Sequence, residues 1–183
     1  MRVLYATVMP TPVYPDGTWQ PPPADPWPLS RQSVERHAPQ AEAVSIHPLN
    51  WWEYWDAVEQ EWGYADLMLV EQDIVLHSRA IPELEACRQS WCLFPYPHPG
   101  NGGLLKRGLG CTRFSLGFQL AVTLDAVAAV PGCCPRCDGS PERYKCWAHL
   151  DGRIAQAAES LGFTPHVHSP AVGHRDVPPE GEQ

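Results

Sequence analysis

The sequence contains no long hydrophobic run. Its apolar opening stretch, residues 2–9, is followed by Pro10 and is much shorter than the roughly 20 residues that span a bilayer. It also lacks the basic, apolar and small-residue order of a cleavable signal peptide. We therefore expect a cytoplasmic protein that does not bind membranes.

Glycine-rich nucleotide-binding motifs are also missing. Neither GxxxxGK[ST] nor GxGxxG occurs in the 183 residues, which disfavours P-loop and dinucleotide chemistry. Positive charge is scarce, since 13 Lys and Arg stand against 21 Asp and Glu, for a net charge of −8. This balance argues against a protein held on nucleic acid mainly by phosphate contacts, although it leaves room for a local basic groove.

The composition is that of a globular protein. Apolar residues make up 44% and charged residues 19% of the chain, and its length suits one domain. We expect a single domain over residues 1–175. It would carry a cysteine-rich insertion at residues 131–149 and be followed by a disordered tail at residues 176–183.

Strand-like and helical patterns alternate along the first half. The strand-like runs are residues 2–9, 42–47, 65–77 and 91–96. Four segments have helical patterns: one capped by Ser30, one capped by Asn50, one beginning at Pro82, and one from Asp151 to Gly162. In the second, an apolar stripe is formed by Trp51, Trp55, Val58 and Trp62. This order predicts an α/β fold with a Rossmann-like, mostly parallel sheet flanked by helices.

The run ADLMLVEQDIVLH, residues 65–77, begins as an apolar strand, and two acids, Glu71 and Asp73, follow the apolar residues. In parallel sheets, ligands bind at the carboxyl ends of the strands, where these acids fall. Hard divalent cations take carboxylate oxygens as ligands. The run therefore predicts a metal site, and the alternative is an ordinary polar exit from a strand.

A second metal site is predicted in the cysteine-rich insertion. Four soft ligands follow the spacing Cys134-x2-Cys137-x8-Cys146-x2-His149, with Cys133 as an alternative to Cys134. Two short-spaced pairs suit tetrahedral zinc, and four protein ligands make a structural site. The alternative interpretation is a set of free thiols.

The remaining thiols are expected in the core. They are Cys87, Cys92 and Cys111.

Four segments, in order, resemble those of nucleotide-sugar glycosyltransferases of the GT-A fold. They are MLVEQDIV, LGCTRFS with Gly110 and Arg113, WAHLDGRIAQAAESLGF with Asp151 before a helix, and HSPAVGHR with His174. The resemblance covers residues 2–12 and 65–175, and small phage-type enzymes of this family are the most similar in overall form. The acid motif is Glu-x-Asp where the family has Asp-x-Asp, and Asp151 stands alone where the family has an acidic pair.

The resemblance implies a donor-metal site. Asp73 would bind Mn²⁺ or Mg²⁺ directly, and Glu71 would bind the donor ribose, or the metal through water. His174 would complete the coordination, with His168 as its substitute, and a histidine ligand favours Mn²⁺. The alternative is that these histidines are ordinary surface or core residues.

The resemblance also implies residues that act on the substrates. Asp151 would be the base that deprotonates the acceptor hydroxyl, and Arg113 would hold phosphate. The alternatives are a helix cap for Asp151 and a structural ion pair for Arg113. The loop after the first strand would touch the nucleotide, through Thr7, Pro10 and Thr11.

The function implied is a metal-dependent, inverting glycosyltransferase. It would move a sugar from a nucleotide-sugar donor to an acceptor hydroxyl, with a hydroxymethylated pyrimidine in phage DNA as the candidate acceptor. One alternative is a nucleotidyltransferase, which also uses strand-edge acids and a metal. Another is a zinc-stabilised binding module without catalysis, whose Trp-rich and Pro-rich surfaces recognise a partner.

Overall fold

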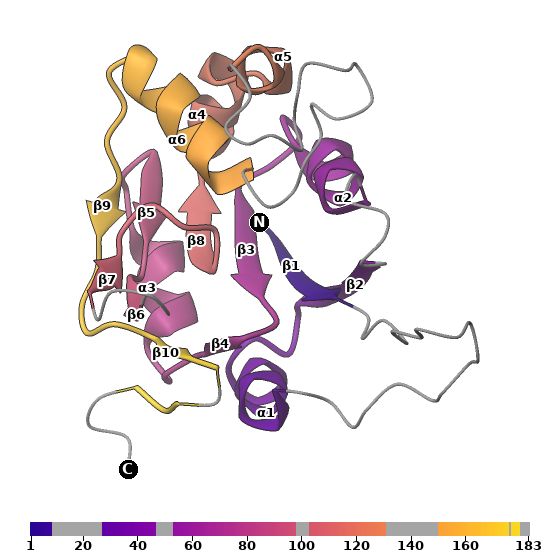
Figure 1. The fold of residues 1–183 in the computed structure, drawn as a ribbon, viewed down its shortest axis with the longest axis vertical. Helices are drawn as coiled ribbons and strands as arrows, with labels where there is room; N and C mark the ends of the chain where they lie inside the picture. Colours follow the sequence, from indigo (N-terminus) through magenta and orange to yellow (C-terminus); the bar gives the residue numbers. More distant parts are fainter. Residues whose placement is uncertain (9–26, 47–52, 98–102, 131–149, 176, 180–183) are drawn as a thin grey trace, which may run out of the picture.

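The protein has a central six-stranded mixed sheet flanked by helices (Figure 1). The computed structural model describes residues 1–8, 27–46, 53–97, 103–130, 150–175 and 177–179. In spatial order the strands are β2 (Glu42–Ile46), β1 (Arg2–Val8), β3 (Leu67–Glu71), β8 (Cys111–Phe114), β5 (Trp91–Leu93) and β9 (His166–Val167). The expected α/β class and the mostly parallel sheet are confirmed, with one exception. Strand β8 runs antiparallel to both β3 and β5.

Helices cover both faces of the sheet, as expected. One face packs against α2 (Glu53–Glu61), α4 (Leu116–Ala121), α5 (Leu124–Ala128) and α6 (Leu150–Ser160). The other face packs against α1 (Pro28–His37) and α3 (Ala80–Ala86). The sheet is therefore buried on both sides, which explains why β3 reads as a continuous apolar run without alternation.

Two short antiparallel pairs lie outside the main sheet. Strand β4 (Ile74–Val75) follows β3 after a two-residue turn and pairs with β10 (Gly173–His174). Strand β6 (Tyr96–Pro97) pairs with β7 (Leu104–Leu105). The pairing of β4 with β10 holds the C-terminal part of the chain beside the turn that contains Asp73.

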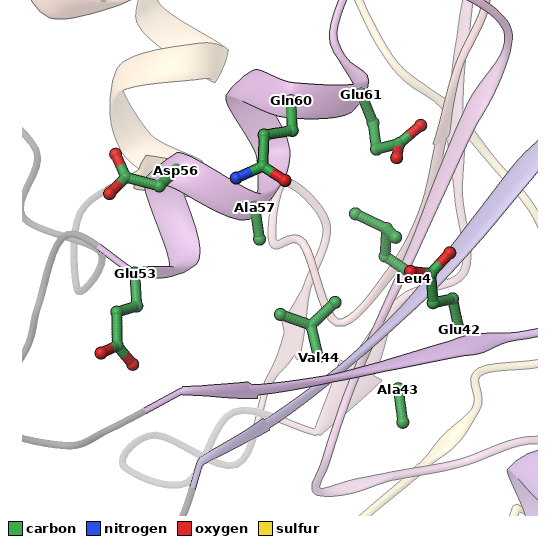
Figure 2. Close-up of a pocket in the computed structure, with 9 residues that line it drawn as sticks. All are labelled: Leu4, Glu42, Ala43, Val44, Glu53, Asp56, Ala57, Gln60 and Glu61. Carbon is green, nitrogen blue, oxygen red and sulfur yellow. The ribbon is translucent and has the colours of Figure 1, made fainter.

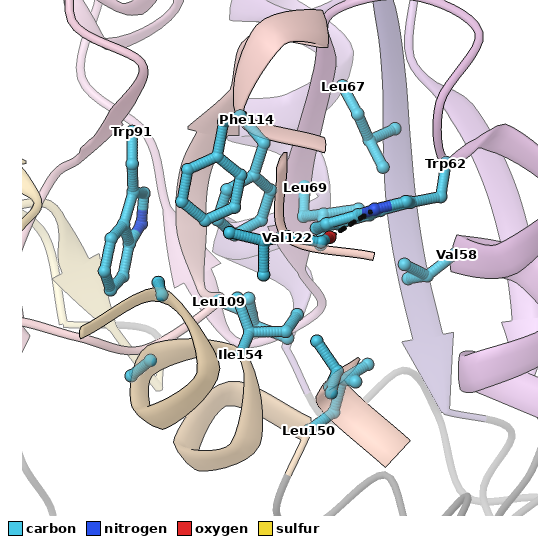
Figure 3. Packing of buried hydrophobic residues seen from close by; sticks show 14 of the residues in the cluster. Val58, Trp62, Leu67, Leu69, Trp91, Leu109, Phe114, Val122, Leu150 and Ile154 are labelled. Atoms are coloured by element: carbon cyan, nitrogen blue, oxygen red, sulfur yellow. Dashed lines mark hydrogen bonds between the residues drawn. The ribbon is translucent and has the colours of Figure 1, made fainter. Parts of the chain in front are cut away.

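The larger core is rich in aromatic residues (Figure 3). The Trp62 ring lies 5.2 Å from that of Phe114, and its indole N–H donates to the backbone oxygens of Gln119 and Val122 at 3.1 and 3.0 Å. The predicted stripe is confirmed at Trp55, Val58 and Trp62, which are all buried. Asn50 and Trp51 lie outside the described residues.

Two helix starts differ from the prediction. Ser30 does not cap α1, because the helix begins at Pro28 and Ser30 is buried inside it. Proline is favourable at the first helical position because its φ is already helical and its missing N–H is not needed there. Helix α3 likewise begins at Ala80, two residues before Pro82.

Helix α6 largely follows its predicted pattern. Ile154, Ala157 and Ala158 are buried. Gly162 has a φ of +81°, the left-handed conformation expected of a glycine that ends a helix. Leu161 continues the spacing of these residues, but it lies beyond the last helical residue and is 54% exposed.

Several predictions fall outside the described residues. These are the proline-rich stretch from Pro10 to residue 26, the cysteine-rich insertion, and residues 176 and 180–183 of the expected tail. In the described part of that tail, Val177 exchanges backbone hydrogen bonds with His174 at 3.1 and 3.2 Å. No described helix combines the length and apolarity needed to cross a lipid bilayer.

Candidate functional site

The candidate site lies at the carboxyl end of β3. The residues from Leu67 to Val70 are completely buried, and the chain then leaves the sheet through Glu71 and a turn at residues 72–73. The backbone N–H of Glu71 donates to the Gly110 carbonyl at 2.9 Å, and the Asp73 carbonyl accepts from the Arg175 N–H at 2.7 Å. The two acids are thus held by backbone contacts from distant parts of the sequence.

Asp73 and His174 form the closest pair in the site. The His174 Nε2 atom lies 3.0 Å from Asp73 Oδ2, and the pairing of β10 with β4 places His174 opposite Ile74. The His174 side chain is 7% exposed and that of Asp73 is 23% exposed. The Tyr96 ring lies 5.3 Å from the His174 imidazole and covers it. The histidine is therefore held in place and the carboxylate remains reachable.

Glu71 lies among other negative charges. Burial raises the pKa of Glu71 from 4.5 to about 8, and the charges of Asp73 and Asp151 add to this rise. A hydrogen bond from the Tyr54 hydroxyl, 3.5 Å from Glu71 Oε1, opposes it. With no cation nearby, Glu71 therefore holds its proton at neutral pH. A bound divalent cation would favour the carboxylate.

Asp151 reaches the same region from the start of α6. It lies in the first turn of the helix, after Leu150, and its Oδ1 accepts from the Gly152 N–H at 2.7 Å. Its charge raises the pKa values of both Glu71 and Tyr96, so Asp151 lies close enough to interact electrostatically with both groups. Asp151 therefore lies inside α6 and does not cap it. An acid in the first turn of a helix is still favourable, because the helix dipole is positive at that end.

Two tyrosines that were not predicted complete the site. Tyr54 of α2 is 3% exposed and Tyr96 of β6 is 7% exposed. Burial raises the pKa of both phenols, and the charges of Glu71 and Asp151 raise these pKa values further. Both hydroxyls therefore remain neutral donors. A single tyrosine carries no sequence signal for such a role, since most buried tyrosines belong to the core.

The site fits a divalent cation in part. The pair formed by Asp73 and His174 offers a carboxylate oxygen and an imidazole nitrogen that face each other, a combination that suits Mn²⁺. Nearby Asp151 adds negative charge that a cation would offset, and a bound cation would also favour ionisation of Glu71. Two protein ligands leave most of the coordination shell to water and to substrate phosphate, which is common for such ions.

Arg113 is not brought to this site. Its guanidinium binds the Asp66 carboxylate and donates to the carbonyls of Cys87 and Gln89 at 3.0 and 3.2 Å. Because β8 is antiparallel to β3, Gly110 lies beside Glu71 while Arg113 pairs with Met68, toward the start of β3. These contacts favour the structural ion pair over a phosphate-binding role.

The predicted nucleotide-binding residues are described in part. Thr7 lies near the carboxyl end of β1, next to β3, and its hydroxyl donates to the Val44 carbonyl at 3.2 Å. Pro10 and Thr11 lie outside the described residues. The structure therefore pairs Asp73 with His174, and the charges of Asp73 and Asp151 act on Glu71. Among the described residues, the ligand atoms of these four side chains do not form a group within 4.8 Å of one another.

The expected zinc ligands Cys134, Cys137, Cys146 and His149, and the alternative Cys133, also lie outside the described residues. Within the described part of the chain, a different set of ligands gathers. The ligand atoms of Cys87, Cys92 and His168 all lie within 4.8 Å of one another. Cys92 and Cys111 are buried, as expected of core thiols, whereas Cys87 is only half-buried.

A pocket of about 500 Å³ lies between α2 and the edge strand β2 (Figure 2). Four acids line it: Glu42, Glu53, Asp56 and Glu61. Arg2 pairs with Glu42 and Glu61 at 2.6 and 3.0 Å, so part of this charge is offset. A negatively charged diphosphate is repelled by such a lining, and the acids at the end of β3 do not reach it. We therefore do not assign this pocket to a nucleotide donor.

No protein-family model matches the chain, and no curated protein matches it in sequence.

Proposed function

We propose that the protein is a metal-dependent glycosyltransferase that moves a sugar from a nucleotide-sugar donor to an acceptor hydroxyl. One observation carries the proposal. Asp73 and His174, which are marked by the resemblance and come from distant segments, pair at the turn that follows β3. Asp151, from a third segment, is near enough for its charge to raise the pKa of Glu71. A plain polar exit from a strand does not account for this convergence.

In this proposal Asp73 and His174 hold Mn²⁺ or Mg²⁺. The ion supplies positive charge that offsets the charge developing on the diphosphate leaving group. Glu71 lies within the same set of acids and binds the donor ribose, or water on the ion. The neutral Tyr54 hydroxyl then orients the Glu71 carboxyl group.

Asp151 is the proposed base. It lies in the first turn of α6, and its charge acts on Glu71, so the acceptor hydroxyl would bind close to the end of β3. A carboxylate there would take the proton of the acceptor hydroxyl as the sugar is transferred, which gives an inverting reaction. Arg113 has no direct part, since its contacts fix the start of β3.

The fold agrees with this proposal. A largely parallel α/β sheet with a ligand-binding carboxyl edge is what the GT-A resemblance implies. The proposed acceptor is a hydroxymethylated pyrimidine in DNA, which rests on the resemblance to small phage-type enzymes. With a net charge of −8, DNA binding would have to rely on a local basic surface.

Thermal unfolding with a panel of UDP-, GDP- and CMP-sugars tests donor binding. We expect one donor to raise the melting temperature only when Mn²⁺ is present, because the ion bridges the protein and the diphosphate. Asp73→Asn should lose this response. The matched control is Asp125→Asn, an exposed acid of α5, which should keep it. If no donor stabilises the wild type, or if Asp73→Asn responds like the wild type, the proposal fails in this form.

Asp151→Asn separates donor binding from transfer. We expect this variant to keep the Mn²⁺-dependent stabilisation by donor and to lose sugar transfer to DNA, measured by mass spectrometry of nucleosides after co-expression. Full transfer by the variant would remove Asp151 as the base. The products also separate the alternatives, since a nucleotidyltransferase releases pyrophosphate and a binding module leaves donor and DNA unchanged.

A further inference from the structure

A second group of ligands lies on the face of the sheet covered by α1 and α3, away from the acids of β3. Cys87 follows the last residue of α3, Cys92 is the central residue of β5, and His168 follows β9. The backbone N–H of His168 donates to the Leu93 carbonyl at 2.9 Å, which fixes the histidine beside β5. Three segments thus place two thiols and an imidazole within 4.8 Å.

The imidazole is oriented like that of a metal-binding histidine. His168 Nδ1 lies 3.7 Å from Glu83 Oε2, and the ring stacks on Phe94 with centroids 4.9 Å apart. The other nitrogen, Nε2, is buried and has no hydrogen-bond partner among the residues that the structure describes. Histidines that bind metals commonly direct their second nitrogen to a carboxylate, and Glu83 offers one to His168 at a distance longer than a hydrogen bond.

The spacing of the three ligand atoms suits zinc. In a tetrahedral site with bonds of about 2.0–2.3 Å, ligand atoms lie roughly 3.5–4 Å apart. The ligand atoms of Cys87, Cys92 and His168, all within 4.8 Å of one another, therefore lie close to the spacing of a zinc site. Two thiolates would offset the charge of Zn²⁺ at a site where Cys92 is completely buried. The Arg113 guanidinium, which contacts Cys92, favours the thiolate form of this residue and opposes the desolvation that raises its pKa.

We propose that Cys87, Cys92 and His168 bind a zinc ion, with water in the fourth position and Glu83 orienting the histidine. The ion would join the end of α3, the centre of β5 and the end of β9. Strand β9 has two residues and lies at the edge of the sheet, so it has few other contacts to hold it. The site goes beyond the proposed transferase function and does not depend on it.

Metal analysis of the purified full-length protein tests the site. Cys87→Ala and His168→Gln should each contain about one zinc per chain fewer than the wild type, because loss of one of three ligands abolishes tight binding. Cys111→Ala is the matched control, since this thiol is buried outside the cluster, and it should keep the wild-type zinc content. Any zinc bound by the cysteine-rich insertion is common to all these proteins and cancels in the comparison.

Peptide-resolved alkylation of the wild type gives a second readout that needs no folded variant. We expect Cys87, which is half-buried, to resist alkylation in the native protein and to react once a chelator has removed the metal. The proposal is overturned if folded Cys87→Ala and His168→Gln retain the full zinc content. It is also overturned if Cys87 reacts equally with and without chelator, or if Cys87 reacts only after a reductant, which would indicate a disulfide with Cys92.

Discussion

At the scale of single residues, the protonation state of Glu71 depends strongly on its surroundings. Its pKa is raised from 4.5 to about 8 by burial and by two nearby acids. Between pH 4.5 and about pH 8, Glu71 of the folded protein retains a proton that the unfolded chain has released. The free energy of unfolding therefore falls as pH rises through this interval, by at most about 1.4 kcal/mol for each pH unit.

The first prediction concerns this penalty. Without added metal, the melting temperature of the wild type should fall between pH 5 and pH 8, and that of Glu71→Gln should fall less, because the amide has no proton to lose. Differential scanning calorimetry across this range measures both slopes. Parallel slopes for the two proteins would show that Glu71 ionises normally.

The second prediction concerns Arg113, which is 9% exposed and bound to Asp66. Arg113→Ala should lower the free energy of unfolding by about 2–3 kcal/mol, because it leaves two part-buried hydrogen bonds unmade and the Asp66 carboxylate without its cation. Arg107→Ala is the control. Arg107 pairs with Glu159 at 2.6 Å, but it is 63% exposed, so its loss should cost less than about 1 kcal/mol.

Urea denaturation measures both free energies. A contrary result would be an Arg113→Ala protein of wild-type stability that no longer responds to donor, since this would return Arg113 to a phosphate-binding role.

Arg113 also illustrates a limit of motif reading. The spacing from Gly110 to Arg113 suggested that both residues face one ligand, but spacing does not give the direction of a strand. In an antiparallel β8, Gly110 lies beside Glu71 and Arg113 lies near the opposite end of β3. Glu71 and Asp73 were predictable because an apolar run that ends in acids marks the carboxyl end of a strand by itself.

At the scale of elements, the segment before β8 lies close to the site. Tyr96 packs its ring against Gly108 and Gly110, and it contacts His174 on its other side. A methyl group on Gly110 would lie 2.5 Å from the Tyr96 ring and 2.7 Å from the Ile74 side chain. The two-stranded β6–β7 and β4–β10 pairs therefore meet around a position that accommodates only glycine without rearrangement.

The third prediction follows from this contact. Gly110→Ala should destabilise the protein by about 1–3 kcal/mol, since it forces Tyr96 or Ile74 out of a packed position. Gly152→Ala in α6 is the control. Nothing lies within 4 Å of its new methyl group, so it should stabilise the helix by up to about 1 kcal/mol. Thermal or urea unfolding measures both, and equal effects of the two substitutions would contradict the packing described.

The cluster of Cys87, Cys92 and His168 could not be predicted from spacing. The two thiols are close in sequence, but the histidine comes from a strand far along the chain that pairs in parallel with β5. A pattern search finds ligands in short-spaced pairs, such as those of the cysteine-rich insertion. A site that depends on the pairing of distant strands becomes visible only once the strand order is known.

At the scale of the whole molecule, the main sheet and the strand pair that holds His174 are separate sets of hydrogen-bonded strands. The six-stranded sheet is complete at β9, whereas His174 belongs to the β4–β10 pair. Fold class was predictable from alternating strands and helices, because each pattern depends on neighbours in sequence. The antiparallel β8 and the small β-pairs were not, because they depend on which distant strands meet.

The fourth prediction uses this separation. A chain that ends at Val172 should keep its far-ultraviolet circular dichroism and lose the Mn²⁺-dependent stabilisation by donor, because His174 is gone and the sheet remains. A chain that ends at residue 179 keeps β10 and Val177, and it should respond like the full-length protein. If the shorter chain still binds donor through the metal, His174 is not a ligand.

The pairing of Asp73 with His174 joins residues 101 positions apart. A ribosome that adds about 5–20 residues per second takes roughly 5–20 s to make the chain between them. During that interval the nascent protein can fold part of its sheet, yet it lacks the contact between Asp73 and His174. Under the proposed function, synthesis itself therefore delays the first moment at which a new molecule can bind a donor, and a chain released before His174 would be inactive.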